Sequence, residues 1–188
     1  MTRRSPGADA VIAFCGLAAV AASIVLVPSM RGALGAGLAL LMLAIAVIDA
    51  RRLIIPNRLN AAAFALALLE ATVGEPQAVT AMTFACLRGA VLALLFLALR
   101  ALYARLRGRE GLGLGDVKLA GIAGAWLDWV MIPVAIEIAA FAALTVYILR
   151  GFARNRPLRA AGLLPFGLFL APTIWLCWLL QVTLLEPF

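Results

Sequence analysis

Residues 111–119 read Gly-Leu-Gly-Leu-Gly-Asp-Val-Lys-Leu, which places a carboxylate, Asp116, at the start of an apolar segment. The rest of the chain is apolar almost throughout. An ionisable side chain inside or at the edge of a membrane helix is costly, so a functional role is the default expectation for it. A second carboxylate, Asp49, ends an earlier apolar run and is followed by Ile55-Pro56-Asn57. These two aspartates are therefore the candidate site.

The composition is that of an integral membrane protein. The chain has 188 residues, of which 65% are hydrophobic and 13% charged, whereas soluble domains are about half apolar and about a quarter charged. Its net charge of +7 would suggest nucleic acid in a soluble protein. In a membrane protein, dispersed arginines instead fix topology and contact anionic lipids. We expect lipids, and no nucleic acid, as partners.

Apolar runs predict an all-α bundle of about seven transmembrane helices, six forming a core and one preceding it. The first run continues well past a possible signal-cleavage site, Ala19-Val20-Ala21, so a retained helix is favoured over a secretory signal. We therefore divide the chain into residues 1–31, with the first helix, and a six-helix domain over 32–188. The seven runs cover about residues 10–28, 32–48, 58–73, 80–103, 114–126, 130–149 and 163–185.

The distribution of basic residues predicts a cytoplasmic N-terminus. In that orientation Arg51 and Arg52, the arginines at 105–109 and those at 150–159 all lie inside, together with Arg3 and Arg4, while Arg31 alone lies outside. Asp49 then ends an inward-running helix and Asp116 begins an outward-running one. Both carboxylates are expected at the cytoplasmic boundary, where only packing of the bundle brings them together.

Two carboxylates that share one proton are the chemistry of an aspartic peptidase. One, ionised, accepts a proton from the attacking water, and the other, protonated, polarises the scissile carbonyl. The pair titrates as a unit, so neither role is assigned to Asp49 or Asp116 individually. This chemistry requires no metal or cofactor. The chain has no histidine, so a Ser-His or Cys-His nucleophile is excluded, and its three cysteines form no Cys-x-x-Cys motif.

Residues flanking the aspartates are expected to support them. Gly113 and Gly115 should give backbone conformations closed to other residues and let a substrate backbone approach. Pro56-Asn57 is a helix-start signal. Lys118, about 200° around a helix from Asp116, either contributes to the site or extends toward lipid phosphate.

A second charged pair is predicted within the bundle. Arg88 and Glu137 each lie about seven or eight residues from the outer end of their helices. Unpartnered charges at that depth cost several kcal/mol, so we expect a structural ion pair between them.

The motifs together resemble those of a known family. Asp49 followed by Ile55-Pro56-Asn57, and then Gly113-Leu114-Gly115-Asp116-Val117-Lys118, is similar to the type IV prepilin peptidase family of GxGD membrane aspartic proteases. Residues 164–171 resemble a third family segment, with Leu168 where many relatives have proline, and the resemblance covers residues 30–188. It implies that Asp49 and Asp116 are catalytic and cut pilin or pseudopilin precursors at the cytoplasmic face of the bacterial inner membrane. The cut would follow a glycine that ends a short basic leader.

The sequence differs from the larger members of this family in one respect. Larger family members have a cytoplasmic domain with paired Cys-x-x-Cys motifs and methylate the new N-terminus. This sequence lacks those motifs, which implies a peptidase without methyltransferase activity, similar to the short members that serve tight-adherence (Flp) pili.

Two other functions stay open on the sequence. A related GxGD protease would cut within transmembrane helices or process preflagellins, although Ile55-Pro56-Asn57 favours the prepilin branch. A non-enzymatic, proton-coupled membrane subunit would instead carry its carboxylates near mid-membrane.

Overall fold

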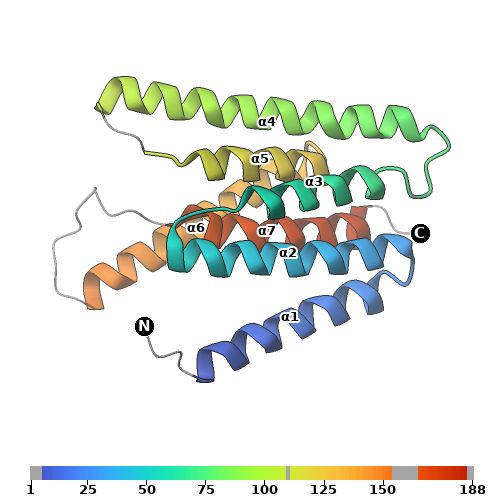
Figure 1. The fold of residues 1–188 in the computed structure, drawn as a ribbon, viewed down its shortest axis with the longest axis horizontal. Helices are drawn as coiled ribbons and strands as arrows, with labels where there is room; N and C mark the ends of the chain where they lie inside the picture. The colour runs from blue at the N-terminus through green and yellow to red at the C-terminus, as the bar shows by residue number, and fades with distance from the viewer. Residues whose placement is uncertain (1–5, 109–110, 154–164, 186–188) are drawn as a thin grey trace.

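The structure, a computed structural model, describes residues 6–108, 111–153 and 165–185. Within these ranges all regular secondary structure is helical, which confirms the all-α prediction (Figure 1). The helices are α1 (Pro6–Leu26), α2 (Met30–Arg52), α3 (Asn57–Glu70), α4 (Ala78–Arg107), α5 (Leu114–Trp126), α6 (Met131–Ala153) and α7 (Phe166–Leu180), and a π-helical turn, Gln181–Leu185, extends α7.

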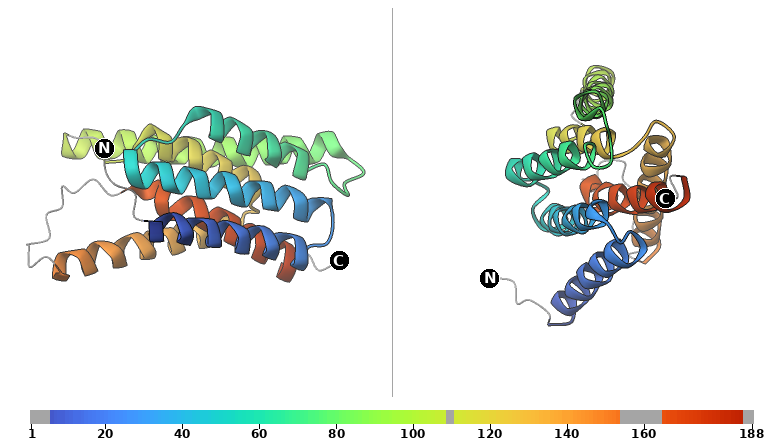
Figure 2. Two further views of the ribbon diagram at one scale, coloured as in Figure 1. Left: turned by 60° about the horizontal axis from the view of Figure 1, so that its bottom comes forward. Right: turned by 90° about the vertical axis from the view of Figure 1, so that its right-hand side faces the viewer.

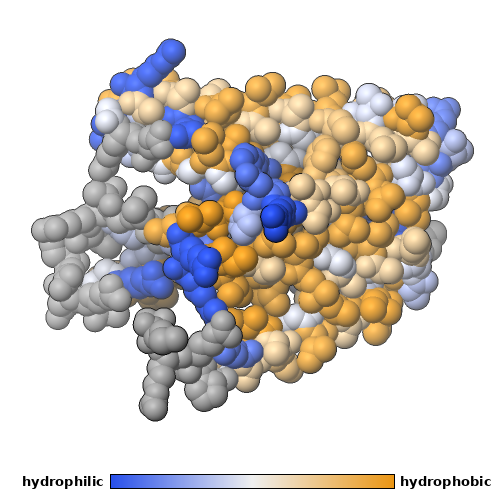
Figure 3. All heavy atoms as spheres, in the orientation of Figure 1, coloured by the Kyte–Doolittle hydropathy of each residue, from blue (hydrophilic) through white to orange (hydrophobic). Residues whose placement is uncertain are grey.

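Five of these helices are long and apolar enough to cross a membrane: α1, α2, α4, α6 and α7 with its extension. The other two, α3 and α5, have 14 and 13 residues and are shorter than the roughly 20 residues that a perpendicular span needs. Apolar residues cover most of the middle of the surface in Figure 3, apart from one hydrophilic group there, and polar residues lie toward both ends. The chain is therefore a multi-pass membrane protein. Its predicted orientation remains an inference from charge, and six of its arginines (Arg3, Arg4, Arg109, Arg154, Arg156 and Arg159) lie outside the described residues.

The helices α4 and α1 lie at opposite edges of the bundle, with α2, α3, α5 and α7 between them (Figure 2). Helix α4 packs mainly on α5, α1 packs on α2, and α2 and α6 both pack on α7. The end of α2 and the starts of α3, α5 and α7 consequently lie at one end of the bundle (Figure 1). We call this the aspartate end, because Asp49 and Asp116 lie there.

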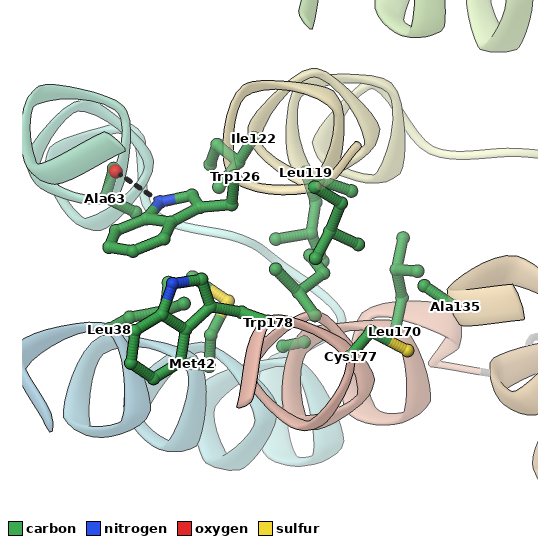
Figure 4. Close-up of a cluster of buried hydrophobic side chains, with 14 of the residues drawn as sticks. Leu38, Met42, Ala63, Leu119, Ile122, Trp126, Ala135, Leu170, Cys177 and Trp178 are labelled. Atoms are coloured by element: carbon green, nitrogen blue, oxygen red, sulfur yellow. Dashed lines mark hydrogen bonds between the residues drawn. The ribbon is translucent and has the colours of Figure 1, made fainter. Parts of the chain in front are cut away.

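Two tryptophans pack together in the core near the C-terminal ends of α5 and α7. Trp126 of α5 and Trp178 of α7 are buried, with ring centroids 6.0 Å apart in an edge-to-face arrangement (Figure 4). The Trp126 indole N–H donates to the Ala63 carbonyl at 2.9 Å, and that of Trp178 donates to Glu70 at 3.3 Å. Because both indole N–H groups are satisfied, these large side chains stabilise the junction of α3, α5 and α7.

Small residues let α4 and α5 approach closely. A Cβ built on Gly89 would lie 2.8 Å from the Gly121 carbonyl oxygen, and one on Gly124 would lie 3.0 Å from the Gly89 Cα. Such contacts let two backbones pack directly, which is how small residues associate helices in membranes.

Gly89→Ala is expected to destabilise the protein, because the new methyl group meets backbone and α4 must move away from α5. Gly7→Ala in α1 is the matched control. Its Cβ meets nothing within 4 Å, so the substitution should be neutral or stabilising by up to about 1 kcal/mol through helix propensity. Thermal unfolding in detergent measures both. Equal melting temperatures for the two variants would contradict the α4–α5 packing described above.

The predicted ion pair of Arg88 with Glu137 is not formed. Arg88 instead lies 3.4 Å from Asp128, just after α5, and donates to the Gly124 carbonyl at 3.2 Å. Glu137 is exposed on α6. The physical reason is that α6 packs mainly on α7 rather than beside α4. Two side chains at the same predicted depth in the membrane therefore do not meet when their helices are not neighbours.

Candidate active site

Asp49 lies in the last turn of α2 and is 5% exposed. The helix ends at once with Leu53, whose left-handed backbone (φ 55°) directs its N–H to the Asp49 carbonyl at 2.9 Å. The chain then turns back through Ile55 and Pro56 into α3. This tight ending keeps Asp49 in a regular helix while the next segment folds over it.

Asp116 lies in the first turn of α5 and is partly buried. Its carboxylate accepts the backbone N–H of Gly113, the residue that precedes the helix, at 3.2 Å. An acidic side chain at this position satisfies one of the free N–H groups of a helix start. The contact therefore fixes the side chain close to its own helix end.

The N-terminus of α7 links the two aspartates. The backbone N–H of Leu168 donates to Asp49 at 2.9 Å, and the amide of Gly167 interacts with both Asp49 and Asp116. The carboxylates also lie close enough to act electrostatically on each other. Free N–H groups and the positive end of the helix dipole favour negative charge at this position. Two acidic groups from separate helices thus share one helix start.

The glycines around the site serve close packing rather than unusual backbone angles, which corrects the expectation from the sequence. Gly113 has φ −73°, and Gly115 is not among the positive-φ residues. A Cβ on Gly115 would lie 3.1 Å from Ile55, and one on Gly167 would lie 2.8 Å from Ile55 and 2.9 Å from the Asp49 carboxylate. Ile55 therefore packs between α5 and α7, and glycine at 115 and 167 leaves it room.

Lys118 pairs with Asn57 and not with Asp116. Its ammonium group donates to the Asn57 side-chain oxygen at 2.7 Å, and Pro56 is the N-cap of α3. The bond joins the start of α3 to Lys118 of α5, two residues after Asp116. The contact therefore ties together Asn57 and Lys118, two of the residues that the sequence predicts to support the aspartates.

Sequence reasoning missed the backbone amides of residues 167 and 168. The signal available was Pro165-Phe166-Gly167, because proline before a helix and a glycine in its first turn predict an accessible helix N-terminus. The sequence could not predict which carboxylate would face that terminus, because this depends on how α2, α5 and α7 pack together.

This geometry suits acid–base chemistry by a coupled carboxylate pair. Like charges that act on each other disfavour double ionisation, so a pair of this kind can share one proton. The ionised member can accept a proton from water, while the protonated member donates a hydrogen bond to a carbonyl. Among the described residues, no group of three or more His, Cys, Asp or Glu side chains is placed to hold a metal ion.

The fold and the site define a class: multi-pass helical membrane proteins that hold two aspartates from separate helices at one end of the bundle. Residues 36–148 match the type IV leader peptidase family. That match covers more than half of the chain and includes Asp49 and Asp116, so the protein belongs to the type IV leader peptidase family.

Individual proteins that the chain resembles are also leader peptidases. The chain is 45% identical over 94 residues to the prepilin leader peptidase/N-methyltransferase of Burkholderia pseudomallei (strain 1026b), covering 47% of this chain and 30% of that protein. It is 35% identical over 75 residues to the enzyme of the same name from Aeromonas hydrophila, covering 38% and 24%. It is also 39% identical over 69 residues to the leader peptidase HopD of Escherichia coli, covering 37% and 44%. The alignments thus span less than half of each relative. No solved structure gives a significant match.

Proposed function

We propose that this protein is a prepilin leader peptidase. It hydrolyses the peptide bond after the glycine that ends the short basic leader of pilin or pseudopilin precursors. Asp49 and Asp116 activate the attacking water, and the reaction needs no cofactor. The observation that carries the proposal is the convergence of both carboxylates on the N-terminal amides of α7, in a chain of the leader peptidase family.

We place the reaction at the cytoplasmic face of the inner membrane of a bacterium. Arg51 and Arg52 end α2 beside Asp49, and Arg105 and Arg107 end α4 at the same end of the bundle. Basic residues mark the cytoplasmic side. The precursor then lies with its leader at this end and its apolar segment along the bundle.

Processing of a precursor tests this function directly. The protein is co-expressed with a pilin-type precursor, and mass spectrometry maps the new N-terminus. We expect one cut between the basic leader and the apolar segment, and no methyl group on the product. A cut within the apolar segment would contradict a leader peptidase and favour a protease that acts inside transmembrane helices. Proton-linked transport without any cleavage would favour the non-enzymatic alternative.

A further inference from the structure

A largely apolar groove of about 530 Å3 opens between α3, α4 and α5, beside the aspartate end. Its volume is within the range of about 300–1,000 Å3 typical of ligand sites. It begins at the bonded pair Asn57 and Lys118 and continues along α4 to Cys86. Cys86 and Ala93 both line it, so at a rise of ~1.5 Å per residue it follows α4 for about 10 Å.

One polar side chain in this groove has no partner. Asn60 of α3 lines the groove, is 7% exposed, and neither its amide nitrogen nor its oxygen has a hydrogen-bond partner among the described residues. A buried amide without partners costs free energy, so such groups are normally satisfied. Asn60 thus carries an amide NH2 group and a carbonyl oxygen in the wall of the groove that no described residue satisfies.

The unsatisfied amide indicates the chemistry of the occupant. A lipid acyl chain offers neither donor nor acceptor. A peptide backbone outside a helix offers both an N–H and a C=O, and in an apolar environment each needs a partner. Helical backbone keeps its own bonds, so the matching ligand is a chain that is locally extended.

Asn60 also lies at the right depth for a substrate. It follows Asn57 by three residues, so it lies about one helical turn, ~4.5 Å, deeper along α3. Asn57 bonds Lys118, which is two residues from Asp116. Along the bundle this offset is short, so a chain cut at the carboxylates needs only a few extended residues, of about 3.3 Å each, to reach the depth of Asn60.

We propose that the α3–α4–α5 groove holds the first apolar residues of the precursor beyond the cut, and that the Asn60 carboxamide pairs with their extended backbone. This inference rests on the proposed function and names its substrate-positioning residue. The unwound segment keeps the scissile carbonyl accessible, and the rest of the apolar helix continues along the groove past Cys86.

Asn60→Leu separates this role from a structural one. The substitution removes an unpaired buried amide, so thermal stability should stay unchanged or rise. Cleavage of the full precursor should fall about tenfold, mainly through KM, because the backbone pairing is lost. A control peptide that contains the leader and the cut site but no apolar segment should be processed equally by both proteins. Unchanged cleavage of the full precursor by Asn60→Leu would overturn the inference.

The native thiol in the groove gives a second readout. Cys15 and Cys86 are both exposed, and Cys177 is buried. In an Asp116→Asn background with Cys15→Ala, mild oxidation should join Cys86 to a single cysteine in the apolar segment of the precursor, but not to one in the leader. A matched protein with Cys86→Ala, which keeps Cys15 on α1, should not cross-link.

The outcomes separate a failure of the proposed peptidase function from a failure of the groove assignment. If the wild-type protein cuts no precursor, the proposed function fails, and this inference with it. If the precursor is cut normally but Cys86 and Cys15 cross-link equally, the function stands and the groove assignment is overturned. Asn60→Leu with reduced cleavage, together with selective cross-linking at Cys86, supports both.

Discussion

Asp49→Ala and Asp116→Ala are each expected to reduce cleavage of a pilin-type precursor by about a thousandfold or more, because groups that act as one unit fail together when either is removed. The double variant should be no worse than either single variant. Alanine at 49 removes the partner of the Leu168 amide, and alanine at 116 removes that of Gly113. Co-expression with the precursor, followed by mass spectrometry of the product, measures the loss.

Two controls separate chemistry from folding. Asp49→Asn and Asp116→Asn keep an oxygen for the backbone amides but cannot share a proton, so both should be as inactive as the alanine variants and as stable as the wild type. Asp9→Ala removes a half-exposed acid that lies 3.5 Å from Arg51 and outside the site, and this variant should process the precursor normally. Unchanged processing after both Asp49→Ala and Asp116→Ala would contradict the assignment.

Gly167→Ala is expected to lower activity by about 10- to 100-fold with little change in the fold. The added Cβ would lie 2.8 Å from the Ile55 Cδ1 and 2.9 Å from the Asp49 carboxylate. Asp49 must then move by a few tenths of an ångström or more. Small misplacements of a reacting group cost up to about 10²-fold in rate. Single-turnover cleavage of purified precursor measures this effect, alongside the melting temperature.

A second-site change tests the cause of that loss. Ile55→Val removes the Cδ1 atom that the new methyl group would meet, so it should recover part of the activity of Gly167→Ala. Leu168→Ala keeps the backbone N–H that binds Asp49 and should retain most activity. Full activity of Gly167→Ala would show that residue 167 does not limit the position of Asp49.

Much of the fold was readable from the sequence because membrane helices are long and apolar. The run from 32 to 48 corresponds to α2 (Met30–Arg52), and Pro56-Asn57 marks the start of α3. The two short helices were also recognisable, since charged or turn-forming residues flank them. Both are predicted as transmembrane helices, but with 14 and 13 residues α3 and α5 are not among the helices long enough to cross a membrane.

Contacts between helices were less predictable, because depth in the membrane does not fix which helices are neighbours. Arg88 and Glu137 are matched in depth, yet Arg88 pairs with Asp128. Gly115 suggested a special backbone angle, but its role is to make room for Ile55. The α7 amides at the site, those of Gly167 and Leu168, lie more than 100 residues beyond Asp49 in the sequence. Such side-chain and backbone contacts depend on the packing of the whole bundle.

The proposed chemistry requires that Asp49 and Asp116 meet at one end of the bundle. Cysteines at both positions, with Cys15 and Cys86 replaced, test this proximity through a short thiol-specific cross-linker in native membranes. Asn57→Cys with Lys118→Cys is the positive control, because the Lys118 ammonium nitrogen and the Asn57 side-chain oxygen are 2.7 Å apart. Asp49→Cys with Asp128→Cys is the negative control, because these positions lie at opposite ends of the bundle. We expect cross-linking between positions 49 and 116 as efficient as that of the positive control. Its absence under conditions that join positions 57 and 118 would contradict the account.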